Sequence, residues 1–193
     1  MTKEHANIAL TGFMAAGKTV VGRSLARCLE WPFVDLDAVI EAGEGTRVRE
    51  IFARRGEAYF REREKAALGE VLDGAGQVIA LGGGAVVDPD SRARLKDRSL
   101  LVWLRVSPLT VLDRTRGSGD RPLLQGGGAP PQGDAAGARA TSAEQAEAMK
   151  LKRIEELSAQ RESIYAQAHL VVDTDDLTVE QVVQRIRQQL CRP

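Results

Sequence analysis

The chain has 193 residues, of which 43% are hydrophobic and 28% are charged, and its formal net charge is zero. These values are typical of one soluble globular domain, which we expect to span residues 1–193, and they give no electrostatic reason to expect nucleic acid or a membrane as a partner. Only two cysteines occur, no apolar run approaches the ~20 residues of a membrane span, and no room precedes the first strand-like segment for a signal peptide, so we expect a cytoplasmic protein.

Five short apolar segments are predicted to be β-strands, and segments with helical spacing of apolar residues lie between them. The strands are expected at residues 6–12, 32–37, 77–84, 99–106 and 169–173. Helices are expected at residues 17–30 and 46–72, with Gly56 dividing the second. A further helix closes the chain, and Thr178 and Gln181 match a capping box at its start. This alternation predicts an α/β fold with a parallel sheet that helices cover on both faces.

Residues 125–148 differ in composition from the rest of the chain, because they contain no Val, Ile, Leu or aromatic residue. Such a segment cannot bury enough apolar surface to offset the entropy lost on ordering. We therefore predict a mobile surface insertion here. The alternative is a tightly ordered loop.

The stretch GFMAAGKT at residues 12–19 fits the phosphate-loop pattern G-x-x-x-x-G-K-[ST] between an expected strand and an expected helix. Backbone N–H groups of such a loop surround phosphate oxygens, Lys18 can reach the terminal phosphates, and the Thr19 hydroxyl can bind Mg²⁺. The alternative is a glycine turn with a solvated lysine. Ala15 stands where many kinases have glycine, and its Cβ restricts the backbone. No guanine-reading N-K-x-D occurs, which leaves ATPases and small-molecule kinases.

Asp35 and Asp37 lie two residues apart at the end of the second expected strand. Residues two apart in a strand share a face, so both carboxylates should point into the crevice at the carboxyl end of the sheet. Mg²⁺ needs only one or two carboxylates, and we expect Asp35 to serve it through water. Asp37 is then expected to accept the proton of a substrate hydroxyl. The alternative is that the pair caps the following helix.

Arg61 and Arg161 are candidates for binding an acidic substrate. Arg61 has glutamates four residues before it and three after it, a spacing that is also typical of a surface ion-pair ladder on a helix. Arg161 lies on an apolar helical stripe, where an arginine needs an anionic partner. A substrate carboxylate and a structural aspartate would satisfy it equally well.

Two further arginines and a glycine run complete the candidate site. Arg121 precedes a proline and the low-complexity segment, a position suited to a lid that closes on a triphosphate. Arg114 could contact the nucleotide, or it could be an ordinary solvated arginine. Gly82, Gly83 and Gly84 follow a buried strand, where they would let a ligand approach the backbone closely; the alternative is a strand-exit turn.

In this order along almost the whole chain, these motifs resemble those of the shikimate kinase family. The segments that carry the resemblance are GFMAAGKTVVGRSLA, FVDLDAVIE, REIFARRGEAYFREREKAAL, VIALGGG, VWL, RPLL and RESIYAQA. The resemblance implies a three-layer P-loop fold with strand order 2-3-1-4-5, a mobile lid at about residues 114–150 and a helical substrate-binding region. It also implies transfer of the γ-phosphate of ATP to the 3-hydroxyl of shikimate, on the route to chorismate and the aromatic amino acids.

The same resemblance assigns roles to individual residues. Catalysis would fall to Lys18, Asp37 and Arg121, and Mg²⁺ to Thr19 and Asp35. ATP would be bound by Gly12, Ala15, Ala16, Gly17, Lys18, Thr19, Val20, Arg114 and Arg121. Shikimate would be bound by Asp37, Arg61, Gly82, Gly83, Gly84 and Arg161. No nucleic acid or membrane partner is implied, and we expect a monomer.

Two features depart from the family pattern, namely Ala15 and the length of the insertion at residues 125–148. Two other functions compete with the leading one. A gluconate-type kinase shares the phosphate loop and also acts on a polyol acid. A ligand-sensing module would keep the fold without turnover, although such a module should have lost a catalytic position or gained a DNA-binding segment.

Overall fold

The structure is a computed structural model that describes residues 6–116 and 138–190, with side chains from residue 145 onward in the second range. Its centre is a five-stranded sheet in which all neighbouring strands are parallel and the order is β2-β3-β1-β4-β5. The strands are β1 (Asn7–Thr11), β2 (Phe33–Asp35), β3 (Val78–Ala80), β4 (Ser99–Arg105) and β5 (Leu170–Asp173). The predicted fold class and strand order are confirmed.

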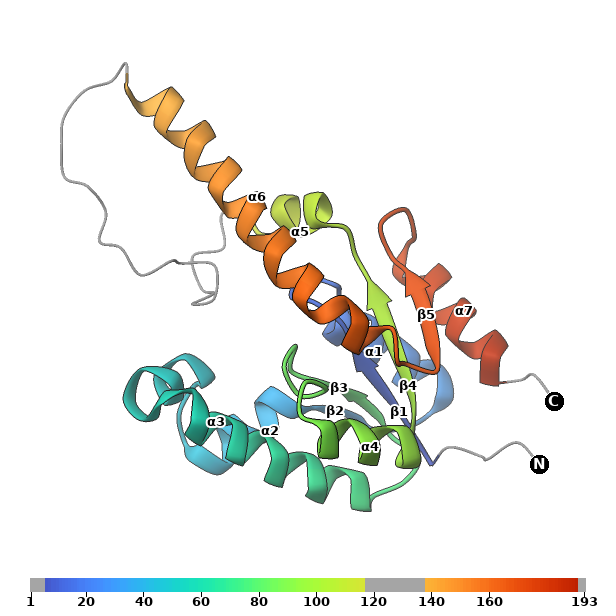
Figure 1. Cartoon of the computed structure of the whole chain (residues 1–193). Helices are drawn as coiled ribbons and strands as arrows, with labels where there is room; N and C mark the ends of the chain where they lie inside the picture. The colour runs from blue at the N-terminus through green and yellow to red at the C-terminus, as the bar shows by residue number, and fades with distance from the viewer. Residues whose placement is uncertain (1–5, 117–137, 191–193) are drawn as a thin grey trace.

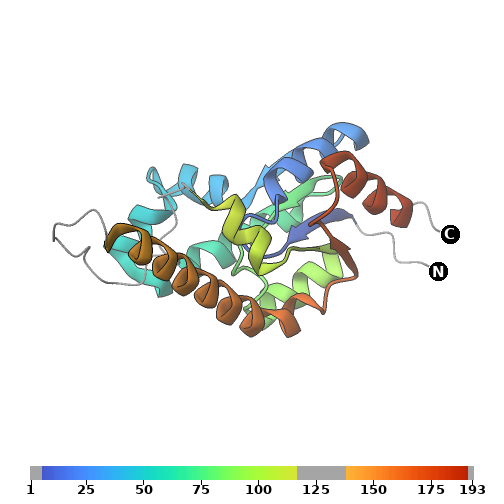
Figure 2. The same cartoon turned by 90° about the horizontal axis from the view of Figure 1, so that it is seen from above.

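Helices connect the strands and cover both faces of the sheet (Figures 1 and 2). They are α1 (Lys18–Leu29), α2 (Leu36–Glu44), α3 (Val48–Asp73), α4 (Pro89–Arg98), α5 (Pro108–Arg114), α6 (Ala138–Tyr165) and α7 (Val179–Leu190). Helices α1, α5 and α7 pack into one hydrophobic core, and α3 and α4 pack into a second core on the opposite face. No helix among the described residues is long and apolar enough to cross a membrane.

Local signals in the sequence produced the expected breaks and caps. Gly56 has φ 79° and ψ 174° and divides α3 into two helical pieces, as predicted. Before α7, the Thr178 N–H donates to Gln181 Oε1 at 2.8 Å and the Gln181 N–H donates to Thr178 Oγ1 at 3.3 Å, which is the expected capping box. Gly22 lets α1 lie directly on β2, because a Cβ there would be 2.5 Å from the Phe33 ring.

The short helices α2, α4 and α5 were not among the predicted segments. In α4 the only large apolar residue is the buried Leu95, so the helical period is weak. Its start carried a usable signal, since Asp88 accepts a hydrogen bond from the Ser91 N–H and a proline follows the cap. Ser107 and the next residue, also a proline, form the same signal before α5.

Residues 138–148 of the segment predicted to be a mobile surface insertion are helical and belong to α6, a helix that the sequence analysis did not predict there. Glu147 accepts a hydrogen bond from Arg116 Nε at 2.8 Å, so this part of α6 contacts α5 and its flank. Farther along, Ile154 is buried in the core and anchors the helix. The remaining residues, 125–137, lie outside the described part of the chain, as does most of the expected lid.

Candidate active site

A cleft of about 770 Å³ lies at the carboxyl ends of β1, β2 and β3. This is the position expected for ligand binding in an open parallel sheet. Its lining comes from the phosphate loop, the start of α2, both halves of α3, the turn after β3, α5 and α6. The residues are Met14, Ala15, Gly17, Lys18, Thr19, Val20, Asp35, Asp37, Glu41, Arg47, Val48, Arg49, Phe52, Phe60, Arg61, Glu64, Ala80, Leu81, Gly82, Gly83, Gly84, Arg114 and Arg161.

The phosphate loop connects β1 to α1, as its sequence pattern requires. Gly17 occupies the N-cap of α1 with φ 88°, and no side chain caps the helix there. The Lys18 ammonium bends over the loop and donates to the carbonyls of Gly12 and Phe13 at 2.9 and 3.0 Å. The start of α1 therefore presents backbone N–H groups and a positive charge to the cleft, a combination that suits phosphate.

Two of the predicted ATP-binding residues, Gly12 and Ala16, are not part of the cleft lining. Ala16 is buried in the core beside α1. Gly12 has φ 142°, and a Cβ there would lie 2.5 Å from the Leu104 carbonyl oxygen. Gly12 and Ala16 therefore support the conformation of the phosphate loop and do not line the cleft.

Ala15 adopts a left-handed backbone with φ 59°. This conformation costs an L-residue with a Cβ about 1–2 kcal/mol, whereas glycine adopts it freely. The loop therefore has the shape that a glycine would favour. Arg114 donates from Nη1 to the Ala15 carbonyl at 3.0 Å and from Nη2 to the Thr174 carbonyl at 3.4 Å. Arg114 thus ties the phosphate loop to the segment after β5 and is not simply a solvated helix arginine.

Asp35 and Asp37 do not share a strand face as predicted, because β2 ends at Asp35 and Asp37 lies in the first turn of α2. Both residues nevertheless line the cleft. Asp35 is at the N-cap position of α2, but its side chain makes no capping hydrogen bond. It accepts instead from the Thr19 hydroxyl at 3.1 Å. The structure thus brings together the two residues predicted to serve Mg²⁺.

Asp37 lies in a strongly electrostatic environment. Burial raises the pKa of its carboxyl group above the ordinary value, and the negative charges of Asp35 and Glu41 raise it further. Lys18 and Arg61 act in the opposite direction and lower the same pKa. Asp37 is therefore a carboxylate with more affinity for a proton than an exposed aspartate, next to the phosphate loop.

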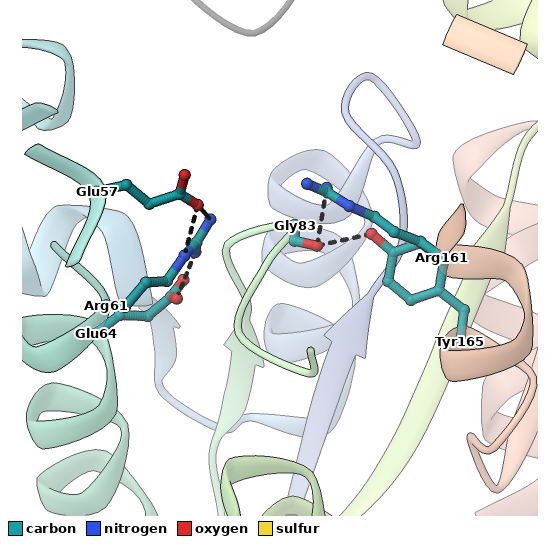
Figure 3. Close-up of polar contacts among 6 residues, drawn as sticks. All are labelled: Glu57, Arg61, Glu64, Gly83, Arg161 and Tyr165. Carbon is teal, nitrogen blue, oxygen red and sulfur yellow. Dashed lines mark hydrogen bonds and ion pairs between the residues drawn. The ribbon is translucent and has the colours of Figure 1, made fainter. Parts of the chain in front are cut away.

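Arg61 is held between two carboxylates of α3 (Figure 3). Its Nη2 lies 3.1 Å from Glu57 Oε1, and its Nη1 lies 2.6 Å from Glu64 Oε2. The expected ion-pair ladder is present, but it is not a surface ladder, because the Glu64 side chain is only 5% exposed and lines the cleft. The ladder therefore fixes Arg61 in the wall of the cleft.

Arg161 projects from α6 on the other side of the cleft (Figure 3). Its Nη1 donates to the Gly83 carbonyl at 3.3 Å, and its guanidinium lies 6.0 Å from the centre of the Phe13 ring. Within the described parts of the chain, no carboxylate forms an ion pair with it. The structural aspartate considered as its partner is thus absent there, and its charge is available to an anionic ligand.

The turn at residues 82–84 lies between these walls, and its lack of side chains gives the charged groups their space. A Cβ on Gly82 would lie 2.7 Å from Glu64 Oε1 and 2.9 Å from Asp37 Oδ1, and a Cβ on Gly84 would lie 2.3 Å from Arg61 Nη1. On Gly83 the nearest atom would be Arg161 Nη1, at an ordinary 3.5 Å. A side chain at Gly82 or Gly84 would therefore displace these charged groups, which gives both glycines a role beyond that of a strand-exit turn.

Glu64 is the main site residue that the sequence analysis missed. Its Oε1 atom is buried and has no hydrogen-bond partner in the described structure. Burial raises the pKa of its carboxyl group, Arg61 lowers it, and the charge of Asp37 raises it again. A signal was present, since Glu64 lies four residues after Phe60 and four before Leu68, on the buried stripe of α3. Arg161 was identified as a candidate by a signal of the same kind, its place on an apolar helical stripe.

Arg121 lies outside the described residues, so its predicted place above the phosphates is not part of this geometry.

Three comparisons with known proteins agree with one another. The family model "Shikimate kinase" matches residues 14–191. A shikimate kinase of Moorella thermoacetica is 41% identical over 95% of this chain and 94% of its own length. The structure of "Shikimate kinase from Acinetobacter baumannii in complex with shikimate" superimposes with a TM-score of 0.81 at 32% identity, covering 96% of this chain and 93% of that one. A gluconokinase from Sinorhizobium meliloti has a TM-score of 0.56 at 17% identity, which reflects the shared fold alone.

Proposed function

The chain belongs to the shikimate kinase family, and we propose that it transfers the γ-phosphoryl group of ATP to the 3-hydroxyl of shikimate in the cleft described above. One observation carries this proposal. The phosphate loop, the carboxylate of Asp37 and the guanidinium groups of Arg61 and Arg161 all line a single cleft. Such a cleft can hold a triphosphate at one end and a small hydroxylated acid at the other. The product would enter the biosynthesis of aromatic amino acids.

Recognition of the acid is assigned to the two arginines. A guanidinium group matches a carboxylate with two parallel N–H donors, and Arg61 and Arg161 approach from opposite sides of the cleft. The two arginines differ before substrate binds. Glu57 and Glu64 neutralise the charge of Arg61, whereas Arg161 donates a hydrogen bond to a neutral backbone carbonyl. Most of the uncompensated positive charge for the substrate therefore comes from Arg161.

We assign the phosphoryl-transfer step to Asp37 and Lys18. The 3-hydroxyl oxygen of shikimate forms a bond to the γ-phosphorus as the bond between that phosphorus and the β–γ bridging oxygen breaks. The hydroxyl proton passes to the Asp37 carboxylate, which burial and nearby carboxylates make a better proton acceptor than an exposed aspartate. Lys18, at the start of α1, stabilises the negative charge on the transferred group and on the departing ADP.

Mg²⁺ is proposed as the ion that accompanies ATP. No cluster of three or more His, Cys, Asp or Glu able to hold a metal occurs among residues 6–116 and 145–190. The pair formed by the Thr19 hydroxyl and the Asp35 carboxylate fits this ion, which keeps several waters and needs few protein ligands. When bound, it would neutralise charge on the phosphates.

The remaining expectations stay predictions: a single domain over residues 1–193, a monomer, a cytoplasmic location, and a lid in which Arg121 contacts the phosphates.

Release of ADP from ATP should depend on shikimate. We expect purified protein to release ADP with shikimate far faster than with gluconate or a nucleoside monophosphate, because only shikimate combines ring hydroxyls with a carboxylate that Arg61 and Arg161 can bind. Gluconate tests the rival kinase, and a protein that binds shikimate without releasing ADP would be a sensor. A rate with shikimate no higher than with buffer would refute the proposal.

The Asp37→Asn variant should lose kcat by about 10²- to 10⁴-fold while ATP affinity changes little, because proton acceptance occurs in the transition state. In the wild type, kcat/KM should fall as the pH drops through the pKa of Asp37, which lies above the ordinary value of about 3.9. This acidic limb should vanish in Asp37→Asn and persist in Asp73→Asn, a matched change at an exposed residue outside the cleft. Equal losses in rate and ATP affinity would instead indicate a structural role.

Alanine substitutions in the glycine turn should have graded effects. The new methyl of Gly84→Ala displaces the Arg61 guanidinium, so we expect the KM for shikimate to rise about tenfold or more, the equivalent of one charge-assisted contact. Gly83→Ala is the matched control and should change KM much less. Steady-state kinetics and thermal melts of both variants provide the test. Equal KM values for the two variants would show that the space beside Arg61 is not required.

A further inference from the structure

We propose that Tyr165 is a positioning residue for shikimate: its hydroxyl holds the Gly83 carbonyl, so that Arg161 can leave this carbonyl and move to the substrate carboxylate. This inference rests on the proposed function, since it assumes that Arg161 binds the acid.

The geometry places two donors on one acceptor (Figure 3). The Tyr165 hydroxyl donates to the Gly83 carbonyl at 2.7 Å, and Arg161 Nη1 donates to the same oxygen at 3.3 Å. The first distance is ideal for an O–H donor, whereas the second is longer than the usual range for an N–H donor. The neutral hydroxyl therefore makes the closer bond, and the charged group is the one more easily released.

The position of Tyr165 in α6 makes this arrangement rigid. It follows Arg161 by four residues, so both side chains lie on the same face of the helix. The residue is 3% exposed, and its ring packs against Trp103 of β4 with 5.7 Å between ring centroids. Burial raises the pKa of the hydroxyl, while the charge of Arg161 and a hydrogen bond with it act less strongly in the opposite direction, so the hydroxyl stays protonated and able to donate at neutral pH. Tyr165 can thus fix the 82–84 turn relative to α6 and β4.

Without the Tyr165 hydroxyl, movement of Arg161 away from the Gly83 carbonyl would reduce the free energy gained on substrate binding. Gly83 is partly buried, as are the hydrogen bonds to its carbonyl, and the side-chain donors to this carbonyl in the described structure are Tyr165 and Arg161. A partly buried carbonyl that loses every such partner incurs a desolvation penalty, which would be subtracted from substrate binding. With Tyr165 in place, Arg161 exchanges a long bond to a neutral oxygen for bonds to a carboxylate, and the carbonyl stays satisfied.

The test is the Tyr165→Phe variant, which keeps the ring and removes only the hydroxyl. Calorimetric titration should give a Kd for shikimate raised about fivefold or more, the lower end of the cost of an unsatisfied buried carbonyl. The KM for ATP and kcat should stay within twofold of the wild type. A Kd for shikimate unchanged within twofold, with only a lower melting temperature, would overturn the proposal.

The chain offers a matched control in its other tyrosine. Tyr59 donates its hydroxyl to Glu44 at 2.9 Å and is not part of the cleft lining. Tyr59→Phe therefore removes a comparable hydrogen bond and should leave the Kd for shikimate within twofold. A rise equal to that of Tyr165→Phe would mean that loss of any such bond weakens binding, and would also overturn the proposal.

A double-mutant cycle tests whether Tyr165 acts through Arg161. In an Arg161→Ala background there is no guanidinium to release, so adding Tyr165→Phe should change the Kd for shikimate less than twofold. A further fivefold loss in that background would show that Tyr165 acts independently of Arg161, against the proposal.

A crystal structure of the wild-type protein with shikimate gives an answer that does not depend on the folding of any variant. The Arg161 guanidinium should contact the carboxylate, and the Tyr165 hydroxyl should still donate to the Gly83 carbonyl. Arg161 still on that carbonyl, or Tyr165 detached from it, would contradict the inference. A protein without shikimate-dependent ADP release would instead refute the proposed function itself, so the two failures are distinguishable.

Discussion

The turn formed by Gly82, Gly83 and Gly84 is the constraint on which the rest of the site depends. It follows β3, and side chains from α2, α3 and α6 converge on it from different directions. Charged groups can approach one another this closely only where no side chain intervenes, and glycine provides that space. The parallel sheet brings the phosphate loop to the same edge, so the two halves of the cleft are joined by the topology of the fold.

The charges around this turn are arranged unequally. Arg61 is neutralised and held in place by carboxylates of its own helix, whereas Arg161 rests on neutral groups. One wall of the cleft is therefore fixed before any ligand binds, and the other can move to meet it. Glu64 and Asp37 lie close to the fixed wall, where burial raises the pKa of both carboxyl groups. This arrangement favours binding of an acid whose carboxylate contacts the arginines and whose hydroxyl groups lie next to Asp37 and Glu64.

Much of this could be predicted from the sequence where a local pattern had one physical cause. The position of the phosphate loop between β1 and α1 and the break at Gly56 were confirmed, and so was the sheet order, which the family resemblance implied. Predictions failed where tertiary contacts decided the outcome. The strand bearing Asp35 ended earlier than its apolar pattern indicated, and residues 138–148 joined a helix that Ile154 anchors farther along. Glu64 was missed because its spacing from Arg61 also fits a surface ladder, although its place between Phe60 and Leu68 on the apolar stripe of α3 was a signal of burial.

The account is tested most directly by removing the charge that the two arginines are proposed to recognise. The wild-type protein should be assayed with shikimate and with its neutral carboxamide analogue, which keeps the ring hydroxyls. We predict a roughly hundredfold or larger fall in kcat/KM for the amide, because two charge-assisted contacts are weakened. Turnover of the amide within a few-fold of that of shikimate would contradict the proposed roles of Arg61 and Arg161.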